Sequence, residues 1–408
     1  MINIKELPNG IRIVHQEVTH TRLVHCGFIL NIGSSDESKE QEGLAHFWEH
    51  MAFKGTKRRK NFHILNRLES LGGELNAYTT KEKVCFYASI LKDHYSKASE
   101  LLFDITFNST FPEKQIEKER QVILEEMAMY RDSPDDSIQD ELDSLVFKNH
   151  ALGQNILGTE ETVASFTQND FFDFIGTRLD TEEVIFSVVG NISFSKALKG
   201  IEGMLSEIAP KKSLYIRSDF HGYSPLEKVI PRDVTQSLCA MGRPAYSLHD
   251  PKRFKLFLLN NILGGPSMNS RLNLSLREKY GYVYSIESSY QAFSDTGFFG
   301  IFFGTEQKTL SRAKSLVIKE LKLMQKKKLG KLQLHMAKEQ VIGQMAMAEE
   351  NYAALMLVYG KSLIDHGKID SLDSIFAKIK ETKAEEIQEI ALEIFDLDQL
   401  THLTYIPN

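Results

Sequence analysis

The sequence predicts an α+β fold made of two tandem homologous α/β domains, each an antiparallel-rich sheet with helices packed on one face. Segments with strand-like and helical patterns occur in blocks, which favours antiparallel layers over a doubly wound parallel sheet. The order of elements also starts again half-way along the chain. Gly55 matches Gly265 and Gly72 falls near Gly281, so both offsets are roughly 210 residues, about the size of one domain. The length of 408 residues accommodates two such domains.

The first domain is expected at residues 1–209 and opens with a β-hairpin. Pro8, Asn9 and Gly10 supply turn chemistry between two apolar segments. Later in this half, Pro112 suits the first turn of a long helix, because a proline there loses no helical hydrogen bond. The expected strands lie at 2–7, 11–18, 23–32, 75–80, 83–91 and 182–192, and the expected helices at 44–53, 61–71, 95–107, 112–131 and 195–208.

Residues 210–228 have weaker periodicity and more turn residues, and are expected to form a linker. The second domain is expected at residues 229–408. Its expected strands lie at 237–243, 282–292 and 297–305, and its expected helices at 252–263, 269–280, 310–325 and 331–366.

Composition excludes several classes of protein. Apolar residues make up 42% of the chain and charged residues 25%, which is enough apolar material for a folded core. The formal net charge of −6 disfavours nucleic acid or an anionic membrane as the main partner. The three cysteines, Cys26, Cys85 and Cys239, have no metal-ligand or disulfide-scaffold spacing. With no signal peptide and no apolar run of about 18 residues, the expected location is the cytoplasm.

The pentapeptide HFWEH carries the clearest chemical signal. On a helix, His46 and His50 lie four residues apart and project from one face about 6 Å apart. That spacing lets both imidazoles bind one Zn²⁺. Glu49 falls on nearly the same face and can take a proton from a metal-bound water. The alternative is a buried apolar helix, flanked by Leu44 and Met51, whose histidines are satisfied by hydrogen bonds.

A third protein ligand is expected on the helix at 112–131, since a carboxylate is the usual companion of two histidines. Glu119 and Glu126 fall in the apolar stripe of this helix, whereas Glu125 lies on a more polar side. A carboxylate buried in such a stripe is costly unless it is paired or binds a metal. Glu126 and Glu119 are therefore the expected metal ligand and supporting residue. The alternative is a solvated, charge-rich helix.

Three segments together resemble a known family. GLAHFWEHMAFKGTKRR, ELNAYTTKEKVCFYA and EKERQVILEEM are similar to the pitrilysin, insulin-degrading-enzyme and mitochondrial-processing-peptidase family of zinc endopeptidases, whose motif is HxxEH. The likeness runs from the LPNGIRIV opening to GFFGIFFGT and so covers most of the chain. The combination of HxxEH, NAYT and a glutamate 76 residues after the second histidine is highly specific.

The resemblance implies roles for individual residues of the first domain. The residues that match the family's zinc ligands are His46, His50 and Glu126, and they imply one Zn²⁺ per chain. Glu49 matches the general base that acts on a zinc-bound water, and Glu119 matches a residue that supports the site. These assignments agree with the helical-face argument for the carboxylates.

The second domain lacks the metal motif. At the offset of roughly 210 residues, the positions of the two histidines and the general base carry Leu256, Asn260 and Leu259, which cannot form a zinc site. The resemblance nevertheless implies a role for this domain, because family members use an arginine and a tyrosine seven residues later to reach the substrate.

That pair corresponds to Arg277 and Tyr284, with Tyr282 as the alternative tyrosine. The roles implied are holding the substrate and donating hydrogen bonds to the oxyanion of the tetrahedral intermediate. Without the resemblance, an exposed arginine and a tyrosine on a strand need no functional explanation.

Further substrate-binding residues are expected in the NAYT segment. Asn76, Ala77 and Tyr78 match a family strand that pairs with an extended substrate backbone. The alternative is a plain hairpin strand. Phe47, inside the pentapeptide, completes the expected substrate-binding residues.

The function expected is a zinc-dependent endopeptidase that hydrolyses peptides or unfolded protein segments. The chain is about half as long as the long single-chain family members, so the resemblance implies a homodimer that encloses a chamber. One alternative is a non-catalytic homologue that acts as a scaffold or partner subunit of a heteromeric complex. The other is a metal-binding structural protein with no turnover.

Overall fold

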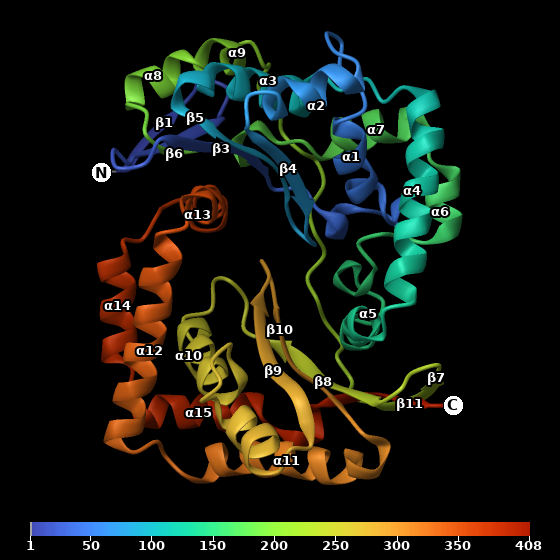
Figure 1. Ribbon diagram of the computed structural model, residues 1–408, viewed down its shortest axis with the longest axis vertical. Helices are drawn as coiled ribbons and strands as arrows, with labels where there is room; N and C mark the ends of the chain where they lie inside the picture. Colours follow the sequence, from blue (N-terminus) through green and yellow to red (C-terminus); the bar gives the residue numbers. More distant parts are fainter. Residues whose placement is uncertain (1) are drawn as a thin grey trace. The chain divides into compact units, whose positions relative to one another are not determined.

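The structure is a computed structural model that describes residues 2–408 (Figure 1). It divides into two compact units. The first unit contains Met1–Ala128, Gln154–Arg217 and Met347–Ile369, and the second contains Met129–Gly153, Ser218–Ala346 and Asp370–Asn408. Each unit therefore takes most of its residues from one half of the sequence and one short segment from the other half.

The first unit is built on a six-stranded sheet in the order β1-β2-β6-β3-β5-β4. Only the pair β2 and β6 is parallel, and all other neighbours are antiparallel. The strands are β1 (Ile2–Glu6), β2 (Arg12–Glu17), β3 (Leu23–Leu30), β4 (Glu74–Thr79), β5 (Val84–Leu91) and β6 (Val184–Gly190). The helices are α1 (Leu44–Ala52), α2 (Asn61–Glu69), α3 (Tyr95–Phe107), α4 (Glu113–Arg131), α6 (Glu160–Ser165), α7 (Gln168–Arg178), α8 (Phe194–Lys199), α9 (Glu202–Ser206) and α13 (Tyr352–His366).

The second unit has a five-stranded sheet in the order β7-β11-β8-β10-β9, again with one parallel pair, β7 and β11. Its strands are β7 (Glu227–Arg232), β8 (Ser237–Ala245), β9 (Val283–Ala292), β10 (Gly297–Thr305) and β11 (Thr401–Pro407). Its helices are α5 (Pro134–Val146), α10 (Arg253–Gly264), the π-helix η6 (Asn273–Lys279), α11 (Leu310–Lys326), α12 (Lys331–Glu349), α14 (Leu372–Glu381) and α15 (Ala384–Ile394). The predicted fold class is confirmed, because both units are α/β with antiparallel-rich sheets.

Each sheet buries apolar side chains on both faces, which the alternation of side chains along a strand makes possible. On β3, Phe28 belongs to the large cluster shared with α1 and α3, whereas Ile29 packs with Met356 of α13 on the other face. On β8, Met241 joins the cluster of α10, and Ala240 packs with Leu142 of α5. The sequence predicted helices on one face, and the structure adds a single helix on the opposite face of each sheet (Figure 1).

These two additional helices each come from the other half of the sequence. Helix α5 precedes β6 in the chain but packs on β8 and β11, and α13 follows β10 but packs on β3 and β6. The units therefore differ from the expected halves 1–209 and 229–408 at these two segments. The expected linker at 210–228 spans the change from the first unit to the second, between Arg217 and Ser218.

The prediction of one long helix at 331–366 is wrong, because the structure has two helices there. Helix α12 ends at Glu349, and α13 begins at Tyr352 after Asn351, whose side chain accepts a hydrogen bond from the backbone N–H of Ala354. Asparagine at this position caps the new helix and lets the chain change direction. Pro134 also marks the boundary between two helices. It follows the end of α4 and occupies the first turn of α5, a helix that was not predicted.

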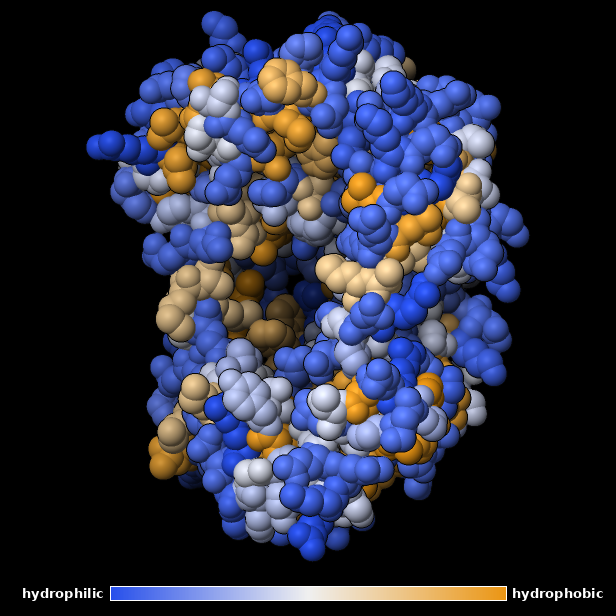
Figure 2. Space-filling view, turned by 45° about the vertical axis from the view of Figure 1, so that its right-hand side comes forward, coloured by the Kyte–Doolittle hydropathy of each residue, from blue (hydrophilic) through white to orange (hydrophobic). Residues whose placement is uncertain are grey.

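Hydrophilic residues cover much of the surface visible in Figure 2, and hydrophobic residues there form smaller groups. Within residues 2–408, no helix is both long enough and apolar enough to cross a membrane.

Candidate active site

Helix α1 carries the pentapeptide and lies with its apolar side in the core of the first unit. Gly43 caps its N-terminus at φ +93°, a conformation that suits glycine because it has no Cβ. A glycine has no side chain to satisfy the first N–H groups, and Glu37 does so instead. Its carboxylate accepts from the backbone N–H of Gly43 at 2.9 Å and of Ala45 at 2.6 Å.

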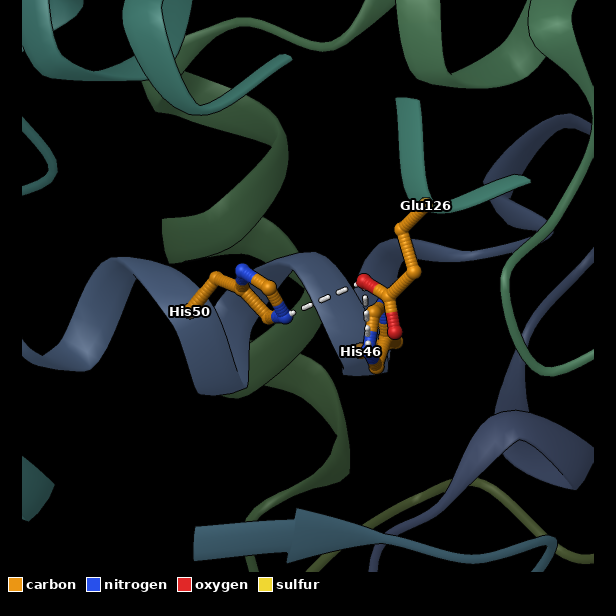
Figure 3. A group of neighbouring side chains, drawn as sticks. All are labelled: His46, His50 and Glu126. Carbon is orange, nitrogen blue, oxygen red and sulfur yellow. Dashed lines mark ion pairs between the residues drawn. The ribbon is translucent and has the colours of Figure 1, made fainter. Parts of the chain in front are cut away.

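The structure brings His46, His50 and Glu126 together (Figure 3). Glu126 reaches from α4 to the two imidazoles on α1, and its Oε2 atom lies 3.8 Å from His46 Nε2 and 3.6 Å from His50 Nε2. Ligands of a tetrahedral Zn²⁺ at about 2.0–2.1 Å stand about 3.3 Å from one another, so this group fits the ion with small adjustments. Two histidines and one carboxylate also leave a fourth position for the reacting molecule, which is typical of catalytic rather than structural zinc sites.

Glu119 and Lys54 hold His50 in place. The Nδ1–H of His50 donates to Glu119 Oε1 at 3.0 Å, and the ammonium of Lys54 contacts Glu119 Oε2 at 2.6 Å. A proton held on Nδ1 by this bond leaves Nε2, which faces Glu126, as the atom that can bind a metal ion. The structure thus places Glu119 next to His50 Nδ1, whereas Glu126 faces His50 Nε2.

Glu49 lies beside this group, and the hydroxyl of Thr79 at the end of β4 donates to its Oε2 atom at 2.6 Å. Burial raises the pKa of Glu49 above its ordinary value, and the bond from Thr79 opposes that shift. A carboxylate with a raised pKa is a better proton acceptor near neutral pH than an exposed one. Thr79 was not among the expected site residues, although the NAYT motif ends in it.

His46 is neutral in this environment. Burial, followed by the neighbouring His50, lowers the pKa of His46 to about 3. A neutral imidazole is the form that binds a metal ion, so burial prepares this side chain as a ligand.

The expected substrate-binding strand is β4, which lies at the edge of its sheet next to β5. Its outer backbone is therefore available for pairing with an extended peptide. Ala77 packs in the cluster that contains α1, whereas Tyr78 packs with α13 on the opposite face. Asn76 points to the same side as Tyr78, because side chains two residues apart share a face. The structure thus directs both side chains away from α1.

The expectation for Phe47 is corrected by the structure. Its side chain is completely buried and packs against the rings of Phe166 and Phe171. On a helix, Phe47 points away from the face shared by His46 and His50, because neighbouring positions are turned by about 100°. It is a core residue and presents no surface to a substrate.

Arg277 and Tyr284 lie close together in the second unit. The guanidinium carbon of Arg277 is 5.6 Å from the centre of the Tyr284 ring, and both residues line a cavity of about 570 Å³. Tyr284 is strongly exposed, whereas Tyr282 is partly buried and stacks on Tyr280, so Tyr284 is the better placed tyrosine to meet a ligand. Arg277 is carried by the π-helix η6, a rare conformation that is frequent at functional sites.

The positions that correspond to the pentapeptide lie on α10 and are structural. Leu256 and Leu259 are completely buried, and the amide nitrogen of Asn260 donates to the backbone carbonyl of Ser288 at 3.1 Å. Within the described residues, the group formed by His46, His50 and Glu126 is the only metal-binding cluster found.

Comparison with known families places this geometry in context. Residues 12–160 match the family description "Insulinase (Peptidase family M16)", and residues 165–341 match "Peptidase M16 inactive domain". A protein of Bacillus subtilis strain 168, named an uncharacterized zinc protease, is 33% identical over 400 residues, which are 98% of this chain and 97% of the relative. The chain belongs to peptidase family M16, the insulinase family. The predicted family is confirmed.

A second relative in family M16 is an uncharacterized zinc protease of Rickettsia felis, 34% identical over 397 residues, with 96% of this chain and 95% of that protein covered. Two solved structures have the same fold over the whole chain. A protease from Helicobacter pylori has a TM-score of 0.93 at 19% identity and is covered to 99%. The peptidase M16 inactive domain from Pseudomonas fluorescens has a TM-score of 0.92 at 18% identity and is covered to 98%. Family membership and the names of the relatives support a zinc protease-like role.

Proposed function

We propose that this protein is a zinc-dependent endopeptidase that hydrolyses peptides or unfolded protein segments. The observation that carries the proposal is the convergence of His46 Nε2, His50 Nε2 and Glu126 Oε2 next to the partly buried carboxylate of Glu49. A structural zinc site would have four protein ligands and would not need a general base beside it.

His46, His50 and Glu126 would hold the metal ion in this proposal. A Zn²⁺ ion held there would supply Lewis-acid chemistry, which makes a water easier to deprotonate and a scissile carbonyl easier to attack. Glu49 accepts a proton from the attacking water and delivers it to the leaving amine. Thr79 keeps the Glu49 carboxylate oriented through its hydrogen bond.

The free edge of β4 supports an extended peptide as the substrate, because backbone pairing demands little of the peptide's sequence. Arg277 and Tyr284 are proposed to hold the substrate and to donate hydrogen bonds to the oxyanion. Their proximity and exposure are compatible with that role. A homodimer enclosing a chamber stays a prediction from the family resemblance.

The test is the variant Glu49→Gln, which keeps the size of the side chain but removes its capacity to accept a proton. We expect about one zinc per chain, as in the wild type, and a loss of about 10²–10⁴-fold in kcat on a quenched peptide library. Glu40→Gln, which changes an exposed carboxylate in the loop before α1, is the matched control and should retain activity.

The same experiment separates the alternatives. A scaffold or structural metal protein would bind zinc and cleave nothing in either form. If the folded, zinc-loaded wild type cleaves no member of the library, the endopeptidase proposal fails.

A further inference from the structure

A partly buried arginine in the linker joins two segments on which the site depends. Arg217 is the last residue of the linker that belongs to the first unit. Its Nε and Nη2 atoms each donate to the Asp36 carboxylate at 2.8 Å, in a two-point ion pair. The same guanidinium donates to the backbone carbonyl of Glu82 at 2.9 Å and to that of Asn31 at 3.2 Å.

The first segment held by Arg217 is the loop 33–37, which fixes the start of α1. Asp36 in this loop also accepts from the backbone N–H of Gly33 at 2.8 Å. The next residue, Glu37, is the carboxylate that caps α1 by accepting from two N–H groups at its start. Both acids are almost completely buried, and Arg217 provides the positive charge that pairs with Asp36.

The second segment is the turn 80–83, which follows β4 and therefore fixes the position of Thr79. The backbone N–H of Ser34 donates to Thr80 O at 3.1 Å, and that of Ser35 donates to Lys81 O at 2.7 Å. The two segments pack so closely that a Cβ on Gly33 would lie 2.5 Å from Lys81 O. Arg217 binds a carboxylate of the loop and a carbonyl of the turn, and so clamps them together.

We propose that Arg217 is a positioning residue for Glu49. Glu49 lies on α1 and its hydrogen-bond donor Thr79 lies on β4, so the contact between them depends on how these two elements are held. The clamp formed by Arg217 acts on the segment next to each of them. The three metal-binding side chains lie on α1 and α4, and none lies on β4. Displacing β4 therefore changes the contact between Thr79 and Glu49 without moving a metal-binding side chain.

The inference rests on the proposed function, and its test starts from a zinc-loaded wild type that cleaves peptides. In Arg217→Lys a point charge remains for Asp36, but the planar fork that reaches two partners is lost. We expect the zinc content to be unchanged, KM to stay within about 2-fold and kcat to fall about 10-fold, because small displacements of a reacting group are costly.

Lys212→Ala is the matched control. Lys212 also belongs to the linker and pairs with Glu182, but this pair is exposed and touches neither the loop 33–37 nor the turn 80–83. We expect wild-type kcat from this variant. Should Arg217→Lys be poorly folded, the double variant Asp36→Asn/Arg217→Gln replaces the two-point ion pair by two neutral amides, and it should show the same loss of kcat.

A double-mutant cycle with Thr79 distinguishes positioning from general loosening of the fold. Thr79→Val removes the hydrogen bond to Glu49. If Arg217 acts through that bond, adding Arg217→Lys to Thr79→Val should lower kcat by less than about 2-fold. Such non-additivity is informative because the two residues do not contact each other, and separate sites normally act independently. Full additivity of the two losses would overturn the inference, as would wild-type kcat in Arg217→Lys. An inactive wild type would instead overturn the proposed function itself.

Discussion

Helices α1 and α10 hold corresponding places in the two units but bury different side chains. Helix α1 places the Nε2 atoms of His46 and His50 close to Glu126 Oε2, and it also carries Glu49. Helix α10 buries leucines in the positions of His46 and Glu49, and they pack within the apolar core of the second unit. Met336 stands at the corresponding offset from Glu126 and is largely exposed.

The difference teaches that the fold does not require the polar group. The second unit forms the same type of sheet and helix layer with an apolar helix in this place, so the side chains of α1 are present at a cost to stability. His46 shows this cost directly, because its Nδ1 atom is buried without a hydrogen-bond partner. A polar group present at such a cost in stability is best explained by function. The comparison can be tested by giving each helix the residue found at the corresponding position of the other.

The largest effect is expected from removing the carboxylate that the second unit lacks. Glu126→Gln takes away the only acidic member of the group, and a neutral amide binds Zn²⁺ weakly. We expect the zinc content measured on the purified protein to fall well below one per chain. Peptide cleavage should fall by about 10³-fold or more, since the metal contributes several kcal/mol to the transition state.

Glu125→Gln is the matched control for this change. Glu125 is the preceding residue on α4 and is exposed, whereas Glu126 is partly buried against the histidines. The control should keep both zinc and activity. Equal losses in the two variants would show that α4 needs its charge in general and does not supply a specific ligand.

A reciprocal exchange of polar and apolar residues tests the stability side of the comparison. Leu259→Gln places an amide in a completely buried apolar position and should cost about 3 kcal/mol in the free energy of unfolding. Glu49→Leu makes the opposite change in the first unit and should cost less than about 1 kcal/mol, because it removes a carboxylate whose pKa is raised by burial. Thermal and urea unfolding of the metal-free proteins measures both. A larger cost for Glu49→Leu would mean that the polar group stabilises α1.

Helical spacing placed His46, His50 and Glu126 among the expected site residues, and the structure brings these three side chains together. The spacing of His46 and His50 and the stripe that contains Glu126 depend only on the geometry of single helices, which the sequence determines locally. Phe47 shows the limit of that reasoning, because its burial follows from the tertiary packing of α7 against α1. Thr79 shows the same limit. The motif indicates a strand, but only the packing of β4 on α1 reveals which side chain meets Glu49.

The main features of the fold could also be predicted from the sequence, but its details could not. Blocks of strands and helices indicate an antiparallel-rich α/β fold, and the repeat of the pattern indicates two copies. The exchange of α5 and α13 between units was missed, because an amphipathic helix carries no information about which of two similar sheets it covers. The end of α12 at Glu349 was missed although Asn351, two residues later, is a residue type that caps the start of a helix.

The comparison also predicts that α1 makes the stability of the protein depend on pH. Burial, then the charge of His50, lowers the pKa of His46 to about 3, whereas the unfolded chain has the ordinary value of about 6.5. Below pH 6.5 the unfolded state therefore binds a proton that the folded state does not. Stability is complete above pH 6.5 and is lost as the pH falls, by about 1.4 kcal/mol per unit.

The variant His46→Leu copies the second unit, where Leu256 occupies this place, and should remove that loss. Between pH 6.5 and 5, we expect the metal-free wild type to lose about 2 kcal/mol more than the variant in urea unfolding. Other buried histidines, such as His15 and His25, contribute equally to both proteins and cancel in the difference. The reciprocal change Leu256→His should add a loss of the same sign to α10, because Leu256 is also fully buried. Both variants could instead show the wild-type dependence of the free energy of unfolding on pH. Protonation of a histidine at this place would then not distinguish the two helices. The cost in stability would have to come from the carboxylates beside the histidines.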